Sequence, residues 1–290
     1  MGETLNLRKF DITWIKCTHT VVMLGRRNTG KSFVVRDLLY YHRDVPAGAV
    51  ICPTEGVNPT YSRFIPSVFI HEEYNASIVD NLMARQRKLK LEIQEQEMQY
   101  GSCPYDPRVF LIMDDCGADA DAWARTKQIK NLFMNGRHSN VLVLITMQYP
   151  MGIPPDIRGN IDFVFILREN VVANRKRIWD NYAGIFPTFE MFQDVLNQCT
   201  EDYEMLVIAN GVNSNVITDC VFWYKAEVHP PFKMCSEQFW EIDARLKQEE
   251  RAAAAAAKQR GEDGSEMLDM SKLVRRRTTL PVTVKKHPPL

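Results

Sequence analysis

The segment from Gly25 to Ser32 has the residue types and spacing of a phosphate-binding loop. It reads GRRNTGKS and matches the pattern G-x-x-x-x-G-K-[ST]. Glycines let successive backbone N–H groups turn toward phosphate oxygens, the lysine reaches the β- and γ-phosphates, and the serine hydroxyl binds Mg²⁺. An apolar run precedes the loop and an amphipathic stretch follows it, which is the context this chemistry needs. We therefore expect nucleotide contacts from Gly25, Arg26, Arg27, Asn28, Thr29, Gly30, Lys31 and Ser32.

Polar residues also end two later apolar runs. VFLIMDD ends in Asp114 and Asp115, and VLVLITMQ ends in Gln148. Carboxyl ends of parallel strands meet at the edge of an open α/β sheet where ligands bind. There Asp114 would hold Mg²⁺ together with Ser32, and Asp115 would orient or deprotonate the attacking water. Gln148 would contact the γ-phosphate or that water. The alternative for the acidic pair is a turn that ends a strand.

Apolar runs and helical stretches alternate along most of the chain. Most of the apolar runs are continuous, as in strands buried on both faces of a parallel sheet. We expect strands at 20–25, 49–54, 67–70, 109–115, 141–148 and 162–169, and helices at 31–43, 75–99, 121–137, 171–186 and 188–200. Two further strands, at 203–210 and 216–227, flank the turn sequence GVNSN and should form a hairpin at the sheet edge. The order predicts an α/β fold, a RecA-like P-loop core with helices on both faces.

The sequence predicts three parts: a P-loop ATPase domain (1–232), a C-terminal helix (233–260) and a disordered basic tail (261–290). The last twenty residues carry six Lys or Arg, no acid and three prolines. This tail either only solubilises the chain or contacts nucleic-acid phosphates. The helix at 75–99 is rich in charge, and a solvated face is favoured over a DNA-contacting one.

Composition sets outer limits on the class of protein. The 290 residues have zero formal net charge, so no global field points to nucleic acid. The seven cysteines form no C-x-x-C pair, and several lie in apolar runs, as in a reducing compartment. No signal sequence or membrane-length apolar run is evident, so we expect a soluble intracellular protein. The histidines form no ligand spacing, so we expect no metal other than Mg²⁺.

Several features separate the classes of P-loop protein. No N-K-x-D motif for guanine is present, which argues against a GTPase. The predicted strand at 49–54 lies between the loop and the acidic strand, as in the class in which an additional strand separates the two in the sheet. Gln148 at the end of the next strand is typical of motor ATPases. A kinase or switch protein is weakly disfavoured, because no separate arginine-rich lid is evident.

Five segments in order resemble the poxvirus-type DNA-packaging ATPases of large double-stranded DNA viruses, within the FtsK/HerA superfamily. They are GRRNTGKS, ICPTEGVNPTY, FLIMDDC, NGRHSNVLVLITMQY and PPDIRGNIDFVFILREN, and the likeness spans about residues 15–225. The resemblance implies a homo-oligomeric ring that uses ATP and Mg²⁺ to pump double-stranded DNA into a capsid. It also implies a capsid, portal or membrane component of the virion as partner, and a place in the host cytoplasm, viral factory or virion.

The resemblance also implies roles for particular residues. Lys31 and Ser32 bind triphosphate and Mg²⁺, Asp114 supports Mg²⁺, and Gln148 is the sensor. Asp115 replaces the usual catalytic Glu with a side chain one methylene shorter. The alternative functions are a cellular-type helicase or DNA-transfer ATPase of the same fold, or a P-loop kinase or switch protein.

A ring motor also needs a cation from the neighbouring subunit, which is worth about 10³–10⁵ in rate. Arg137 in NGRHSN and Arg158 in DIRGN are the candidates, because each lies just outside a predicted strand. The alternative for either arginine is a solvated position at the strand end. We expect His138 to be structural.

Overall fold

The structure is a computed structural model that describes residues 5–259, without the side chains of 118, 119, 121 and 254–259. The basic tail expected at 261–290 lies outside the described residues. The chain divides into two compact units, and the second begins at Ala244. No helix within residues 5–259 is long and apolar enough to cross a membrane.

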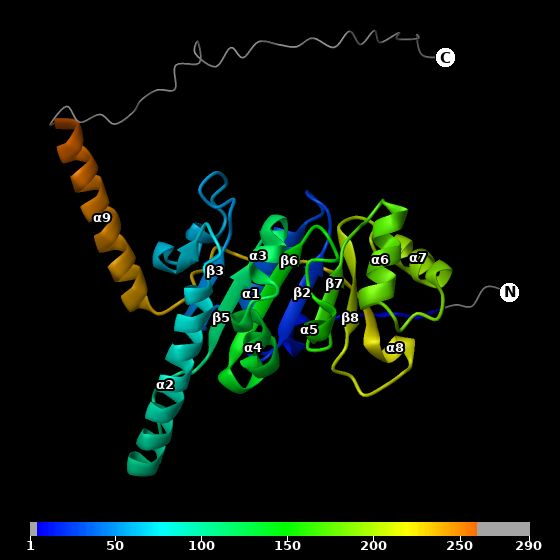
Figure 1. Cartoon of the computed structure of the whole chain (residues 1–290), viewed down its shortest axis with the longest axis horizontal. Helices are drawn as coiled ribbons and strands as arrows, with labels where there is room; N and C mark the ends of the chain where they lie inside the picture. Colours follow the sequence, from blue (N-terminus) through cyan, green and yellow to red (C-terminus); the bar gives the residue numbers. More distant parts are fainter. Residues whose placement is uncertain (1–4, 260–290) are drawn as a thin grey trace, which may run out of the picture. The chain divides into compact units, whose positions relative to one another are not determined.

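The described strands form one nine-stranded sheet in the order β1-β9-β8-β7-β2-β6-β5-β3-β4. Figure 1 shows its central strands side by side. From β7 to β4 all neighbours are parallel, β8 is antiparallel to both β7 and β9, and β1 is parallel to β9. The bounds are β1 Arg8–Lys9, β2 Thr20–Leu24, β3 Ala47–Ile51, β4 Ile70–His71, β5 Val109–Met113, β6 Val141–Met147, β7 Phe163–Ile166, β8 Glu204–Ala209 and β9 Val221–Lys225.

The predicted α/β class is therefore confirmed. The strand that separates β2 from β5 in the sheet is β6, whereas β3, which intervenes in the sequence, lies beyond β5. Both β2 and β5 are buried along their whole length. Continuous burial explains why their sequences are apolar at every position rather than at every second one.

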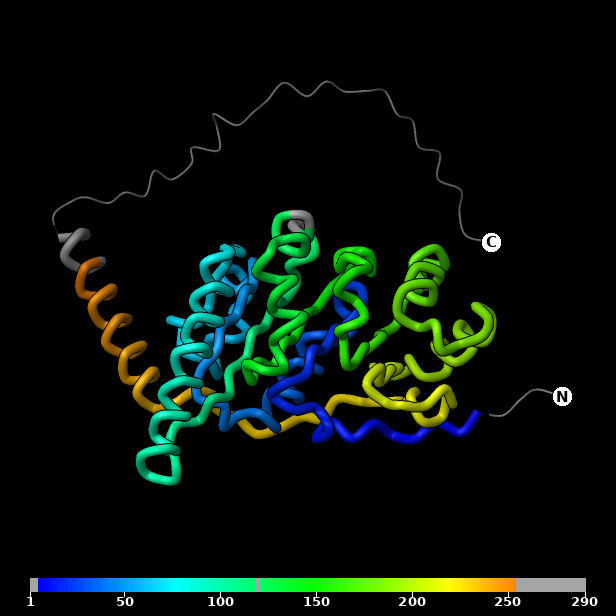
Figure 2. The backbone as a smooth tube through the Cα atoms, turned by 60° about the horizontal axis from the view of Figure 1, so that its bottom comes forward, coloured from blue at the N-terminus to red at the C-terminus, as the bar shows by residue number. Residues whose placement is uncertain are grey.

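Helices cover both faces of the sheet. Side chains of β2 alternate: Val22 and Leu24 face one hydrophobic cluster, Val21 and Met23 the other. The first cluster includes residues of α2 Ala76–Tyr100, α3 Ala120–Trp123, α4 Lys127–Asn135, α5 Pro155–Arg158, α6 Val172–Tyr182, α7 Phe189–Gln198 and α8 Ile217–Cys220. The second includes α1 Lys31–Tyr41, the N-terminal segment and part of the segment 226–236, which runs along that side in Figure 2.

Two expected elements are shorter or broken. The strand expected at 67–70 is a 3-10 helix, Ser67–Phe69, followed by the two-residue strand β4. The Asp243 carboxylate accepts the Ser67 backbone N–H at 2.7 Å, which holds the chain in that turn. The helix expected at 121–137 breaks after Trp123, because Thr126 has extended backbone and its hydroxyl caps the start of α4.

The edge of the sheet also differs from expectation. β9 starts at Val221, since α8 occupies the first residues of the run expected at 216–227. The pairing of β8 with β9 is antiparallel as expected, but α8 makes the connection longer than a tight turn. The two-residue strand β1 was not expected, because Arg8 and Lys9 are exposed and show no apolar pattern.

The C-terminal helix is α9, Glu237–Gln259. Its first turn belongs to the first compact unit, where the Phe239 ring packs edge-on against Phe69 with centroids 4.6 Å apart. The domain boundaries given above remain predictions.

Candidate functional site

The phosphate-loop sequence connects the end of β2 to the start of α1. Gly30 has φ +102°, a left-handed conformation that glycine adopts without steric cost. A Cβ at Gly25 would lie 2.7 Å from Thr29 Oγ1 and 2.8 Å from Leu167 Cβ. These two positions therefore require glycine, one for its backbone angle and the other for its lack of a side chain.

The Lys31 ammonium is held inside the loop. Its Nζ donates to the carbonyl oxygens of Gly25 at 2.7 Å and Arg26 at 2.9 Å, and the residue is only 8% exposed. Burial lowers the pKa of Lys31, and the nearby carboxylates of Asp115 and Asp114 oppose that shift. The Lys31 ammonium therefore lies near the carboxylates of Asp114 and Asp115.

Asp114 and Asp115 follow β5, and Thr146 of β6 contacts both. The Thr146 hydroxyl donates to Asp114 Oδ1 at 2.5 Å and accepts the Asp115 backbone N–H at 3.0 Å. Asp115 has φ +54°, a left-handed conformation, so the chain turns directly after Asp114. Burial raises the pKa of Asp114, although the Thr146 hydrogen bond opposes the shift.

Gln148 lies beside the second acid. Its Nε2 donates to Asp115 Oδ1 at 2.5 Å. The amide thus fixes one oxygen of the Asp115 carboxylate, which leaves the other oxygen for a further partner.

Tyr61 is a buried neighbour of the first acid. The residue is 1% exposed, and its hydroxyl lies close enough to Asp114 to interact with that carboxylate. Burial and the Asp114 charge both raise the pKa of Tyr61. Tyr61 is therefore a buried polar neighbour that helps to set the electrostatics of Asp114.

One cavity of about 1240 Å³ lies at this edge of the sheet, between the phosphate loop and the two acids. It is lined by most of the predicted residues, namely Arg27, Asn28, Gly30, Lys31, Ser32, Asp114, Asp115 and Gln148. The parallel order β2-β6-β5 brings them to one edge, because all three strands end there. Gly25, Arg26 and Thr29 complete the loop: Thr29 Oγ1 donates to the Arg26 carbonyl at 2.7 Å.

The two candidate arginines are placed elsewhere. Arg137 pairs with Asp162, whose other oxygen accepts the Thr20 backbone N–H at 2.8 Å at the start of β2. Arg137 is therefore at the opposite edge of the sheet from its own phosphate loop. Arg158 donates from Nε to the Ile153 carbonyl at 2.7 Å and also contacts Asn181. Neither arginine lines the cavity.

The structure adds polar groups that sequence reasoning missed. Thr146 is the only hydroxyl residue in the apolar run VLVLITMQ, and that isolated polar position was the available signal. Glu55, in the segment ICPTEGVNPTY, accepts the backbone N–H groups of Thr60, Tyr61 and Ser62 at 2.9–3.1 Å. These bonds lower the pKa of Glu55 against the effect of burial and fix the loop that carries Tyr61.

The oxygen donors at the cavity fit Mg²⁺. The Ser32 hydroxyl and the Asp114 carboxylate both line it, and a cation would relieve the cost of the buried Asp114 charge. Within the described part of the chain no cluster of three His, Cys, Asp or Glu residues could hold a metal alone. Mg²⁺ commonly takes only one or two protein ligands and the rest from phosphates and water, so these two donors are sufficient.

The sheet order, the glycine loop and the acid after β5 define a P-loop NTPase fold. No protein-family model matches the chain. It is 39% identical over 220 residues to an uncharacterized protein of Acanthamoeba polyphaga mimivirus, and the match covers 76% of this chain and 77% of that one. It is 40% identical to an uncharacterized protein of Invertebrate iridescent virus 3, over 71% of this chain and 75% of the other. The chain belongs to the same family as these viral proteins.

Solved structures show a more distant likeness. The genome packaging NTPase of Sulfolobus turreted icosahedral virus 2, in complex with ATP-gammaS, has a TM-score of 0.46 and 16% identity. The match covers 73% of this chain and 99% of that chain. The conjugation coupling protein TcpA of pCW3 has a TM-score of 0.49 and 13% identity, over 84% and 75% of the two chains.

Proposed function

We propose that the chain is an ATP-hydrolysing motor that moves double-stranded viral DNA into a capsid. One observation carries the ATPase part: Lys31, Ser32, Asp114, Asp115 and Gln148 line one cavity at the carboxyl edge of a parallel sheet. The family relation to proteins of large DNA viruses supports the viral setting. The packaging step rests on the sequence resemblance described above.

Each residue then has a role in hydrolysis. The Lys31 ammonium breaks its hydrogen bonds to the loop carbonyls and donates to the β- and γ-phosphates instead. Hydrogen bonds from the ammonium to charged phosphate oxygens are stronger than those to neutral carbonyl oxygens. Ser32 and Asp114 would hold Mg²⁺, which would neutralise developing phosphate charge. Asp115 accepts the proton of the attacking water while the bond from the γ-phosphorus to ADP breaks, and Gln148 keeps the Asp115 carboxylate in place.

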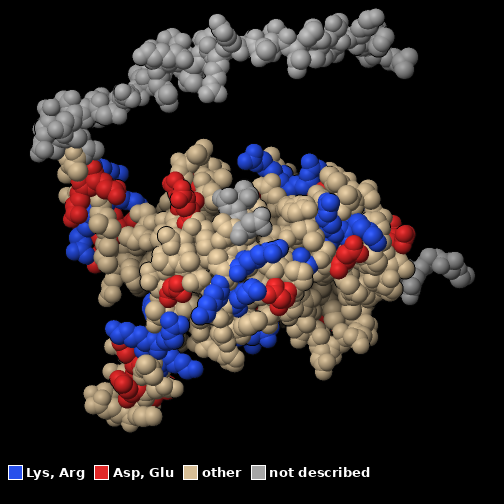
Figure 3. Space-filling model, in the orientation of Figure 1, with Lys and Arg blue, Asp and Glu red and all other residues tan. Residues whose placement is uncertain are grey.

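DNA is the proposed polymer, and charges of both signs lie on the face that Figure 3 shows. In Figure 3, Lys and Arg side chains lie beside Asp and Glu side chains on α2. Lys88 pairs with Glu92 on that helix, and Lys130 of α4 pairs with Asp156 at 2.8 Å. The Lys88–Glu92 pair supports a solvent-exposed charged face on α2 rather than a DNA-binding one. DNA contact in a ring would then come from surfaces that several subunits contribute together.

The proposed partners are further copies of this chain in a ring and a capsid, portal or membrane component of the virion. In such a ring, Arg137 or Arg158 of one subunit serves the nucleotide site of the next. Arg137 lies at the sheet edge opposite its own phosphate loop. It can serve a neighbouring subunit only if the nucleotide cavity of that subunit faces this edge.

ATP turnover with and without double-stranded DNA tests the proposal. We expect purified full-length protein to hydrolyse ATP with Mg²⁺, and double-stranded DNA to raise the rate. Lys31→Ala should reduce turnover at least about 100-fold while the circular dichroism spectrum and melting temperature stay near wild type. Single-stranded DNA is the control polymer. Turnover within a few-fold of wild type in Lys31→Ala would remove the ATPase assignment, and the absence of DNA stimulation would remove the motor assignment.

A further inference from the structure

The cavity extends past the phosphate loop to an antiparallel pair of strands. β8 begins and β9 ends at the edge that carries the loop, because β8 is antiparallel to both β7 and β9. Asp202, Tyr203, Met205, Lys225 and Ala226 line the same cavity as Lys31 and Asp114. We call these five residues the β8–β9 wall.

The β8–β9 wall and the acidic residues lie on opposite sides of the loop. In the sheet order β8-β7-β2-β6-β5, β2 carries the loop, β5 carries Asp114 and Asp115, and β8 lies on the other side. A triphosphate with its terminal phosphate near the acids can extend its nucleoside away from them along the cavity. That direction leads to the wall.

Tyr203 is the prominent residue of this wall. It is 72% exposed although it lines the cavity, and a Cβ at Gly30 would lie 3.7 Å from its Cδ1. The ring therefore stands beside the last glycine of the phosphate loop with most of its surface uncovered. An uncovered aromatic face next to a phosphate site is a platform on which a nucleobase can stack.

The backbone that presents Tyr203 is strained. Asp202 has φ +47° and Tyr203 has φ +64°, so two successive non-glycine residues are left-handed. This conformation is unfavourable for a bulky side chain, and strained residues cluster at active sites and ligand-binding positions. The Glu204 N–H donates to the Glu201 carbonyl at 2.7 Å and closes the turn.

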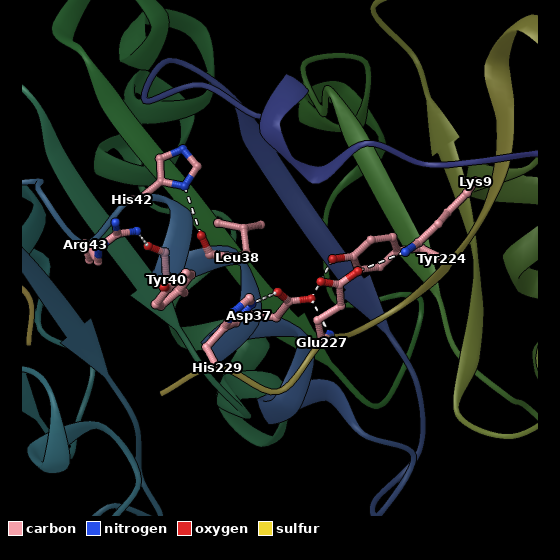
Figure 4. Close-up of polar contacts among 9 residues, drawn as sticks. All are labelled: Lys9, Asp37, Leu38, Tyr40, His42, Arg43, Tyr224, Glu227 and His229. Atoms are coloured by element: carbon pink, nitrogen blue, oxygen red, sulfur yellow. Dashed lines mark hydrogen bonds and ion pairs between the residues drawn. The ribbon is translucent and has the colours of Figure 1, made fainter. Parts of the chain in front are cut away.

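A buried carboxylate ties the end of β9 to the helix that follows the loop (Figure 4). Asp37 of α1 accepts hydrogen bonds from the Tyr224 hydroxyl at 2.6 Å, the Glu227 N–H at 3.0 Å and His229 Nε2 at 2.6 Å. The His229 ring also stacks on Tyr40 of α1 with centroids 3.9 Å apart. Lys225 and Ala226 lie between these anchored residues, so their distance from the phosphate loop is fixed.

We infer that the β8–β9 wall receives the nucleoside, that Tyr203 stacks on the base, and that Asp37 is a positioning residue that holds this wall against α1. The inference rests on the proposed nucleotide function. Stacking accepts any base, so the ring supplies affinity for a nucleoside more than discrimination between adenine and guanine.

Calorimetric titrations with ATP and with inorganic tripolyphosphate, both with Mg²⁺, test the stacking. Tripolyphosphate has the phosphate chain without the nucleoside. We expect Tyr203→Ala to weaken ATP binding about 5- to 100-fold and leave tripolyphosphate binding unchanged, and Tyr203→Phe to bind both like wild type. Tyr100→Ala, which removes an exposed tyrosine at the end of α2, is the matched control and should change neither.

The same titrations separate the two levels of proposal. If Lys31→Ala loses both ligands but Tyr203→Ala binds ATP like wild type, or loses both ligands equally, the stacking inference is wrong and the nucleotide function stands. If wild type binds neither ligand, the proposed function itself fails.

His229 variants test the anchor, since Asp37→Asn risks a folding defect. His229→Ala should weaken ATP binding more than tripolyphosphate binding, and His229→Gln, whose amide can donate to Asp37, should recover part of the loss. If His229→Ala weakens the binding of both ligands equally, or His229→Gln recovers nothing, the Asp37 hydrogen bonds stabilise the fold and do not position the wall.

Discussion

The Thr146 hydroxyl donates a 2.5 Å hydrogen bond to Oδ1 of Asp114. Register makes this contact possible: Met113 is paired with Ile145, so the residues that follow them on β5 and β6 are neighbours at the sheet edge. The same hydroxyl accepts the Asp115 N–H, so one side chain orients both acids.

Thr146→Val should lower ATP turnover about 10- to 100-fold, the usual range for loss of a partner that orients a metal-binding carboxylate. Valine keeps the shape but cannot donate to Asp114. Steady-state rates across a Mg²⁺ titration measure the effect, and Thr146→Ser, which restores the hydroxyl, is the control. Equal activity in Thr146→Val and wild type would show that the acids need no such support.

Asp114→Asn should stabilise the nucleotide-free protein at neutral pH. Burial raises the folded-state pKa of Asp114 above its ordinary value of 3.8, so the folded state favours the protonated form. The charge therefore costs no stability below pH 3.8, and the cost grows as pH rises through the raised pKa. Asparagine removes this cost while its carbonyl still accepts from Thr146.

The melting temperature at pH 7 should therefore be higher for Asp114→Asn than for wild type. The difference in melting temperature between Asp114→Asn and wild type should decrease as the pH approaches 4. Thermal melts from pH 4 to 8 measure it, with Asp194→Asn on the exposed side of α7 as a control. A lower melting temperature for Asp114→Asn at pH 7 would show that the buried Asp114 charge does not destabilise the folded protein.

Asp115→Asn should retain Mg²⁺-ATP binding and reduce hydrolysis about 100- to 10,000-fold, because the amide cannot accept a proton. Gln148→Ala should have a smaller effect, since it only frees the Asp115 carboxylate to rotate. Fluorescent-nucleotide binding and single-turnover hydrolysis separate the two steps. If Asp114→Asn and Asp115→Asn lose binding equally, the division of roles is incorrect.

Arginine action across subunits can be tested by mixing. Inactive Arg137→Ala or Arg158→Ala subunits mixed with Lys31→Ala subunits should recover some ATPase activity, because some mixed interfaces contain both intact parts. Native mass spectrometry must confirm mixed rings. Asp162 is buried and loses its partner in Arg137→Ala, so Arg137→Lys serves as the folding control. No recovery at any ratio would exclude action in trans.

Deletion of 271–290 tests the basic tail. If the tail contacts phosphates, its removal should lower DNA affinity at low salt and flatten the dependence of log affinity on log salt. Basal ATPase rate should not change, because every proposed site residue precedes the tail. Identical salt slopes for the full-length and truncated proteins would exclude DNA contact by the tail.

Much of the fold and part of the site could be predicted from local patterns. Continuous apolar runs identified the parallel strands, and G-x-x-x-x-G-K-S identified the loop, because both signals depend on neighbouring residues alone. The acids were found because they follow an apolar strand directly. Strand 67–70 and the unbroken helix 121–137 were mispredicted, since a carboxylate from α9 and the hydroxyl of Thr126 overrode the local preferences.

The sequence by itself determined that the loop, the acids and Gln148 lie at ends of buried strands, and hence at one edge of a parallel sheet. Only the tertiary structure decided which strand separates β2 from β5, because strand order depends on long-range pairing. It also decided that Tyr203 stands beside Gly30, that Thr146 joins both acids, and that Arg137 lies at the far edge on Asp162. These contacts join residues distant in the chain, so no local pattern encodes them.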